Sequence, residues 1–154
     1  MTLLAWSDQL VLGHAELDET HQEFVALLNA VGAAEGEDVL AQLDAFIAHT
    51  EAHFAREEAW MEERQFPPRG CHGKEHAGIL EVVREVRTRV ASGEVHYGRT
   101  LAEALAEWFP VHASSMDAMF VLFMENPEIF QQAAGSCAEP DHACAHAPEP
   151  ASGR

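Results

Sequence analysis

Apolar residues recur at intervals of three and four positions along most of the chain, which is the spacing of one face of an α-helix. Runs of this kind predict helices over about residues 17–31, 43–61, 72–90 and 98–124. Helix-breaking residues separate them: Gly32 and Gly36, Pro67 and Pro68, Ser92 and Gly93, and Asn126 and Pro127. The second helix is expected to begin near a capping residue at Asp38. Helices joined by short loops, with no strand alternation, predict an all-α, up-down-up-down antiparallel four-helix bundle with an N-terminal arm.

The helical pattern is lost after about residue 134. The remaining segment has no apolar period and several prolines, so it cannot bury enough surface to offset the entropy of ordering. We expect residues 1–134 to form one bundle domain and residues 135–154 to be a disordered tail. The tail carries Cys137, His142, Cys144 and His146, which could hold a soft metal ion. Their spacing matches no closed zinc module, and a solvated tail is therefore favoured.

Composition and charge indicate which kinds of binding partner are unfavourable for this chain. A chain of 154 residues with 47% hydrophobic content suits one domain with a full core. The formal charge of −17, with no run of Lys or Arg, should repel nucleic acid and anionic membranes. No apolar stretch approaches the roughly 20 residues needed to cross a bilayer. Because the N-terminal residues also lack the basic start of a secretion signal, we expect a cytoplasmic protein without membrane insertion.

Histidines and carboxylates interrupt the apolar faces of all the predicted helices. They form one pair per helix: Asp18 and His21, His53 and Glu57, His72 and His76, His112 and Asp117. Residues four apart lie about 40° from each other around a helix, so such a pair can reach one ion or two neighbouring ions. Buried polar side chains are costly unless they are hydrogen-bonded or coordinated. Since imidazole favours transition metals over calcium or magnesium, the pattern predicts a transition-metal centre inside the bundle.

The step from His112 to Asp117 does not fit a regular helix. Five residues correspond to about 140° of net rotation, so the two side chains can face the same centre only if the helix widens locally or they reach different sides of a two-metal unit. Pro110 should bend the same stretch because it removes a backbone hydrogen bond. A widened turn is therefore predicted between these two residues.

Other polar residues receive simpler interpretations. His14, His49 and His96 are expected to be hydrogen-bonded core histidines, and Glu58 and Glu62 are expected to belong to a solvated acidic face. Apolar residues near the candidate ligands in sequence are expected to serve both as core and as the wall of a dry pocket: Phe24, Phe54, Trp108, Phe109 and Ala113.

These motifs, in this order, resemble the hemerythrin family in its bacterial single-domain form. The resemblance covers about residues 6 to 125 and rests on these features: Trp6, Asp18-x-x-His21-Gln22, His53-Phe54-x-x-Glu57-Glu58, His72-x-x-x-His76, and Trp108-Phe109-x-x-His112 with Asp117. It implies two iron ions with the following terminal ligands: His72, His76 and His112 on one ion, His21 and His53 on the other. Glu57 and Asp117 would bridge the ions, together with an oxo or hydroxo group. Asp18 has no ligand role in that pattern, and it would cap or orient the first helix or hold a ligand ring.

The resemblance also implies that dioxygen binds reversibly at the iron with only two histidines. The ligand chemistry agrees, because no Glu-x-x-His occurs within the predicted bundle and a histidine-rich shell stabilises ferric or higher iron less than a carboxylate-rich one. A dry pocket also slows proton delivery to the bound gas. We therefore expect a non-enzymatic protein that stores, delivers or senses dioxygen. A peroxide or nitric oxide detoxifying di-iron enzyme and an iron- or oxygen-responsive regulatory module remain as alternatives, and any oxygen-consuming protein partner is unidentified.

Overall fold

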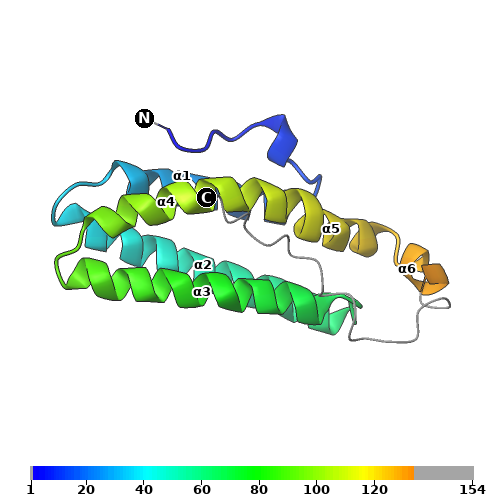
Figure 1. Cartoon of the computed structure of the whole chain (residues 1–154). Coiled ribbons are helices and arrows are strands. Elements are labelled where there is room, and N and C mark those ends of the chain that lie inside the picture. Colours follow the sequence, from blue (N-terminus) through cyan, green and yellow to red (C-terminus); the bar gives the residue numbers. More distant parts are fainter. Residues whose placement is uncertain (1, 134–154) are drawn as a thin grey trace, which may run out of the picture.

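The computed structural model describes residues 2–133 and shows a bundle of long antiparallel helices (Figure 1). The long helices are α1 (Ala15–Ala33), α2 (Asp38–Glu63), α3 (Arg69–Ala91) and α4 (His96–His112). Helix α4 continues through a π-helical turn, η2 (Ala113–Asp117), into α5 (Ala118–Glu125), and the short α6 (Glu128–Ala133) follows. The predicted all-α four-helix bundle is thus confirmed, and residues 2–133 contain no strand. The predicted tail at 135–154 lies outside the described residues.

The helices pack in two layers, and an N-terminal arm crosses one of them. Helix α1 lies beside α4, helix α2 lies beside α3, and contacts between α1 and α2 and between α3 and α4 join the layers. The arm contains a short turn, η1 (Asp8–Leu10), and runs along the outside of the α1–α4 layer (Figure 1). The Asn29 side chain of α1 holds it, because its oxygen accepts the backbone N–H groups of Leu3 and Leu4 at 2.9 and 3.1 Å.

The helix ends differ from the predicted ones in small ways. Gly32 lies within α1, and the turn that follows that helix is made by Gly36, whose φ of 57° suits glycine. Asp38 is the first residue of α2 rather than its cap, and Glu37 occupies the cap position without a side-chain hydrogen bond. Helix α6 was not predicted, because Pro127 was interpreted only as the end of the preceding helix.

The buried apolar residues form two clusters with a polar layer between them. The larger cluster joins α1, α2, α3 and α4 and includes Phe24, Leu28, Leu43, Phe46, Val83, Leu105 and Phe109. The smaller cluster lies toward α5 and consists of Met61, Phe66, Phe120 and Phe123. Along α2, His53 and Glu57 fall between the residues of the larger cluster and Met61. The two clusters therefore enclose a layer of polar side chains.

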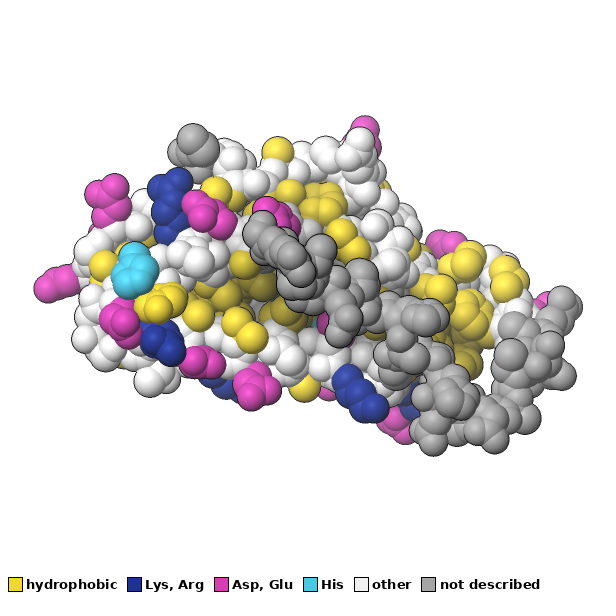
Figure 2. All heavy atoms as spheres, in the orientation of Figure 1, with side chains coloured by type: hydrophobic (Ala, Val, Ile, Leu, Met, Phe, Trp, Pro, Cys, Tyr) yellow, Lys and Arg dark blue, Asp and Glu magenta, His cyan; other side chains and the backbone are white. Residues whose placement is uncertain are grey.

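The surface carries its charges in a scattered pattern. Figure 2 shows acidic side chains distributed over the face in view, with isolated Lys and Arg side chains among them. Several of the cations pair with acids across helices, as Arg84 does with Glu51 at 2.8 Å and Arg87 with Asp44 at 2.5 Å. No helix within residues 2–133 has the length and hydrophobicity that crossing a membrane requires.

Candidate metal centre

Polar side chains from every long helix meet inside the bundle. The cluster consists of His21 from α1, His53 and Glu57 from α2, His72 and His76 from α3, His112 from α4 and Asp117 from η2. Each of these side chains is buried, with at most 5% of its surface exposed. Their ligand-type atoms fall into two sets, each of which could hold a metal ion: His72, His76, His112 and Asp117 in one, and His21, His53 and Glu57 in the other. The structure thus brings together all seven residues that the sequence proposed as ligands.

The carboxylate of Asp117 lies between the two sets. Its Oδ1 is 3.0 Å from Nε2 of His72 and 3.0 Å from Nε2 of His112. Its Oδ2 is 3.2 Å from Nε2 of His21, which belongs to the other set. One oxygen therefore faces each set, which is the arrangement that a carboxylate bridging two cations requires.

The carboxylate of Glu57 is placed in the same manner. Its Oε1 is 3.0 Å from Nε2 of His72, and its Oε2 is 3.2 Å from Nε2 of His53. The two carboxylates approach the cluster from different helices, so each could bridge the same pair of positions.

The widened turn predicted between His112 and Asp117 is present. Residues 113–117 form the π-helical turn η2, in which the backbone N–H of Ala118 bonds to the carbonyl of Ala113, five residues earlier. An i to i+5 turn brings residues five apart onto one face, so both side chains point into the cluster. Pro110 lies in the preceding turn, within α4. If the same five-residue step ran through a regular α-helix, Asp117 would lie about 140° from His112 and would point away from the centre.

Most polar atoms of the cluster have no hydrogen-bond partner. Both ring nitrogens of His21, His53 and His72 and both carboxylate oxygens of Glu57 and Asp117 are buried and unbonded, although they lie close to one another. Each unpaired polar atom at this depth costs about 1–3 kcal/mol, so the cluster is unfavourable as long as these atoms have no partner. Cations at the two positions would satisfy all the inward-facing atoms at once, so these residues fit a pair of metal ions.

Two further carboxylates hold the outer nitrogens of two histidines. Glu58 lies 3.1 Å from Nδ1 of His76, and Glu75 lies 3.0 Å from both Nδ1 of His112 and the indole nitrogen of Trp108. An ionised carboxylate can only accept, so the histidines donate from Nδ1 and their Nε2 atoms are bare when the rings are neutral. Those two Nε2 atoms face each other at 3.3 Å. Facing lone pairs repel, and a cation between them removes the repulsion.

Sequence reasoning missed these two residues. Glu58 and Glu62 both lie at the exposed surface of α2, as expected, but the carboxylate of Glu58 also binds His76, which was not predicted, whereas Glu62 pairs with Arg69. Glu75 was not singled out. The available signal was its place directly before His76, on the helix that carries two candidate ligands.

Without metal ions, the side chains of the cluster shift one another's pKa values strongly. Burial lowers the pKa of His72, but Asp117 and Glu57 outweigh it and raise that pKa to about 9. The pKa of His112 is likewise raised to about 9, where Asp117 and Glu75 overcome burial. Burial and the neighbouring histidines lower the pKa of His76 to about 2. Protons thus occupy part of the cluster, as expected of sites built for cations.

The outer carboxylates respond in opposite directions. The hydrogen bond from His112 lowers the pKa of Glu75, which is therefore ionised at neutral pH. Burial raises the pKa of Glu58 from its ordinary value.

Aromatic rings cover the side of the cluster that contains His21 and His53. Phe24 and Phe109 stack with their ring centroids 4.5 Å apart. The pair contacts the histidines with the ring planes nearly perpendicular: the Phe109 centroid is 5.0 Å from that of His21, and the Phe24 centroid is 6.3 Å from that of His53. Both phenylalanines are fully buried, so they form an apolar wall beside these two imidazoles.

The other expected pocket residues are placed differently. Phe54 stacks on His76 at 3.8 Å, with the two rings almost parallel, and Trp108 stacks on His112 at 4.5 Å. These rings therefore cover the three-histidine set. Ala113 is buried within the larger apolar cluster.

Asp18 lies outside the cluster. Its carboxylate accepts the backbone N–H groups of Leu12 and Gly13 at 2.7 and 3.0 Å, which fastens the end of the N-terminal arm to α1. This agrees with a structural role for Asp18 in orienting the first helix.

The remaining histidines are not core residues, contrary to the prediction. His14 caps α1 with a ring nitrogen and is half-buried, as is His49, which contacts the carbonyl of Thr20 at 3.2 Å. His96 is exposed and packs on Tyr97. Each lies near a helix end or at a helix surface, where an apolar period does not imply burial.

Comparison with known proteins identifies similar chains. The family model described as the hemerythrin HHE cation binding domain matches residues 12–122. A bacteriohemerythrin of Ralstonia nicotianae is 46% identical over 136 residues, which is 87% of this chain and 99% of that protein. Bacteriohemerythrins of Stenotrophomonas maltophilia and Pseudomonas paraeruginosa are each 30% identical, covering 78% and 79% of this chain and 80% and 81% of their own lengths.

Proposed function

Because the chain belongs to the hemerythrin family, we propose that it is a non-heme di-iron protein that binds dioxygen reversibly, for storage, delivery or sensing. The observation that carries this proposal is the position of the two inner carboxylates. Asp117 and Glu57 each direct one oxygen to the three-histidine set and one to the two-histidine set. Two cations held by two shared carboxylates are the simplest occupants of such a geometry.

The proposed ligands follow from the two sets. One iron would be held by His72, His76 and His112, the other by His21 and His53, and both by Glu57, Asp117 and an oxo or hydroxo group. The second iron would then have one ligand fewer and would keep an open position. When bound, this iron pair supplies the electrons and the open position that hold dioxygen.

The chain contributes the shape and polarity of the surroundings. Phe24 and Phe109 lie on the side of His21 and His53, where the open position would be. A pocket lined by these apolar rings can take up a small neutral gas but disfavours water. Fewer water molecules slow proton delivery to the bound gas. These contacts favour reversible binding over turnover, so we propose a binding protein rather than an enzyme.

Stopped-flow mixing of the reduced protein with dioxygen tests this function. A stable coloured species that disappears when the gas is removed is expected. Rapid decay to an oxidised protein, with continued consumption of dioxygen in the presence of a reductant, would instead indicate an enzyme that handles peroxide or nitric oxide.

A further inference from the structure

The two ion positions differ in what lies behind their histidines. On the three-histidine set, His76 contacts Glu58 at 3.1 Å and His112 contacts Glu75 at 3.0 Å through their outer nitrogens. On the two-histidine set, the outer nitrogens of His21 and His53 are buried and have no hydrogen-bond partner. The carboxylate support is therefore confined to one of the two positions.

We propose that Glu58 and Glu75 are positioning residues that make the three-histidine position the tighter of the two, so that it fills first. This inference rests on the proposed pair of metal ions. A carboxylate that accepts Nδ1–H fixes the imidazole tautomer with Nε2 free for the metal, fixes the ring orientation, and makes the ring a stronger donor. The opposite position has one histidine fewer and neither carboxylate, so it would bind its ion more weakly, and replacing the carboxylates measures their share of that difference.

The contacts around both rings support a positioning role. His76 is held between Glu58 and the face of Phe54, and His112 lies against the face of Trp108. The indole of Trp108 also donates to Glu75, so the same residue orients the ring and its carboxylate partner. Each of these imidazoles is thus constrained from its edge and from its face.

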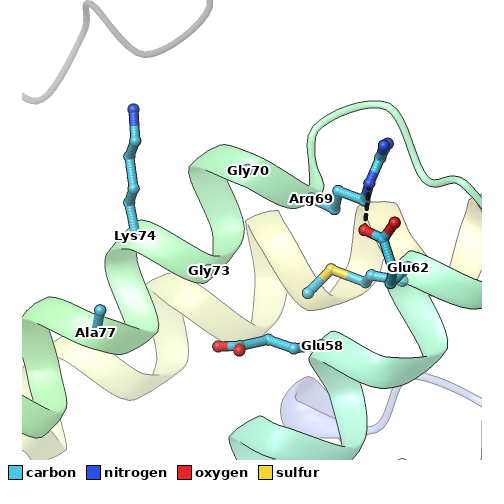
Figure 3. Close-up of a pocket in the computed structure, with 8 residues that line it drawn as sticks. Glu58, Glu62, Arg69, Gly70, Gly73, Lys74 and Ala77 are labelled. Atoms are coloured by element: carbon cyan, nitrogen blue, oxygen red, sulfur yellow. Dashed lines mark hydrogen bonds and ion pairs between the residues drawn. The ribbon is translucent and has the colours of Figure 1, made fainter.

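The alternative is that both carboxylates are ordinary surface acids, since 45% of the Glu58 side chain and 36% of the Glu75 side chain are exposed. Figure 3 shows Glu58 beside Glu62, a second acid of α2 that serves for comparison. A groove of about 590 Å³ lies between α2 and α3, and both Glu58 and Glu62 line it. Glu62 pairs with Arg69 on the rim at 2.8 Å, whereas the carboxylate of Glu58 turns toward α3, where His76 lies. Glu62 is therefore the matched control for charge.

The experiment is a titration of the whole, metal-stripped protein with cobalt(II) under nitrogen, followed by calorimetry and by visible absorption. The wild type should bind two ions in separate steps, and His21→Ala should abolish the second step, which assigns the first step to the three-histidine set. Glu58→Gln and Glu75→Gln should each weaken the first step by about 10-fold to 100-fold and alter its absorption spectrum. The second step should keep its affinity, and Glu62→Gln should match the wild type in both steps.

Three results would overturn the inference. If the Glu58→Gln and Glu75→Gln variants bind like Glu62→Gln, or weaken both steps equally, the carboxylates do not distinguish the positions, while the two-ion centre stands. If the wild type binds fewer than two ions, the proposed function fails together with the inference. Glutamine has nearly the same volume as glutamate, and both side chains are partly exposed, so the variants should fold; comparison of their circular dichroism with that of the wild type checks this.

Discussion

Nε2 of His76 and Nε2 of His112 face each other at 3.3 Å, while the outer nitrogen of each ring is bound to a carboxylate. The two rings come from α3 and α4, in opposite layers of the bundle. When both rings are neutral, helix packing thus holds two lone pairs against each other, and a cation between them, either a proton or a metal ion, removes the repulsion.

Replacing the inner carboxylate Asp117 should remove one bridge between the two positions. Asp117→Asn keeps the volume but loses the negative charge that faces His21, His72 and His112. The iron content should fall from two per chain toward one, as measured by elemental analysis after reconstitution. Asp18→Asn is the control, because that carboxylate only binds the arm; it should keep both ions and lose about 1 kcal/mol of stability. Full iron content in Asp117→Asn would show that a bridging carboxylate at this position is not needed to hold two ions.

The metal-stripped protein should lose stability as the pH rises from 6.5 to 9. The folded-state pKa values of His72 and His112 are raised to about 9, above the ordinary value of 6.5. Their protonation therefore stabilises the fold fully below pH 6.5, and this contribution is lost as the pH rises through 9, at about 1.4 kcal/mol for each pKa unit. Urea unfolding at several pH values measures the change.

The metal-loaded protein provides the contrast for that measurement. Metal ions replace the protons on His72 and His112, so the loaded protein should not lose this contribution between pH 6.5 and 9. The difference in unfolding free energy between loaded and stripped protein should thus widen with pH. If the unfolding free energy of the two forms changes with pH in parallel, metal ions do not replace protons on His72 and His112.

Trimming the aromatic wall should shorten the lifetime of bound dioxygen. Phe109→Leu removes the ring that stacks on Phe24 and faces His21, which should let water approach the open position. Phe123→Leu in the smaller apolar cluster is the control. Both substitutions should cost on the order of 1–2 kcal/mol of stability, but only Phe109→Leu should accelerate loss of the coloured species. Equal lifetimes of the coloured species in the two variants would show that Phe109 does not protect bound dioxygen.

The π-helical turn predicts an unusual tolerance to deletion. Removing the exposed Ser114 would place His112 and Asp117 four residues apart, about 40° from each other in a regular helix, so both would still face the cluster. This single deletion should keep two ions per chain. Removing Ser114 and Ser115 together rotates Asp117 by about a further 100° and should lower the metal content at least as far as Asp117→Asn does. Metal analysis of the two variants decides, and equal loss in both would mean that the widened turn itself is required.

Much of the fold could be predicted because the apolar period is regular and glycine and proline mark its breaks. The widened turn could be predicted because His112 and Asp117 cannot share a face of a regular helix. The helical repeat places these two residues on different faces, whereas metal binding needs them on the same face, and only a widened turn satisfies both. Helix α6 was missed because a run of six residues is too short to show a period.

The support around the histidines could not be predicted in the same manner. Glu58 and Glu75 stand on partly exposed helix surfaces among many other acids, and in sequence they look like solvated side chains. Their role depends on how α2 approaches α3 and how α3 approaches α4, because the rings they bind come from the neighbouring helix. Contacts of this kind between helices have no signature in the spacing along one chain.

The most direct test of the account is elemental analysis of the iron-reconstituted protein together with its visible spectrum under air and under vacuum. Two irons per chain are expected, with a visible absorption band that appears when the reduced protein meets air and disappears when the gas is removed. A single iron per chain, or a reduced form whose spectrum does not respond to dioxygen, would contradict the central claim.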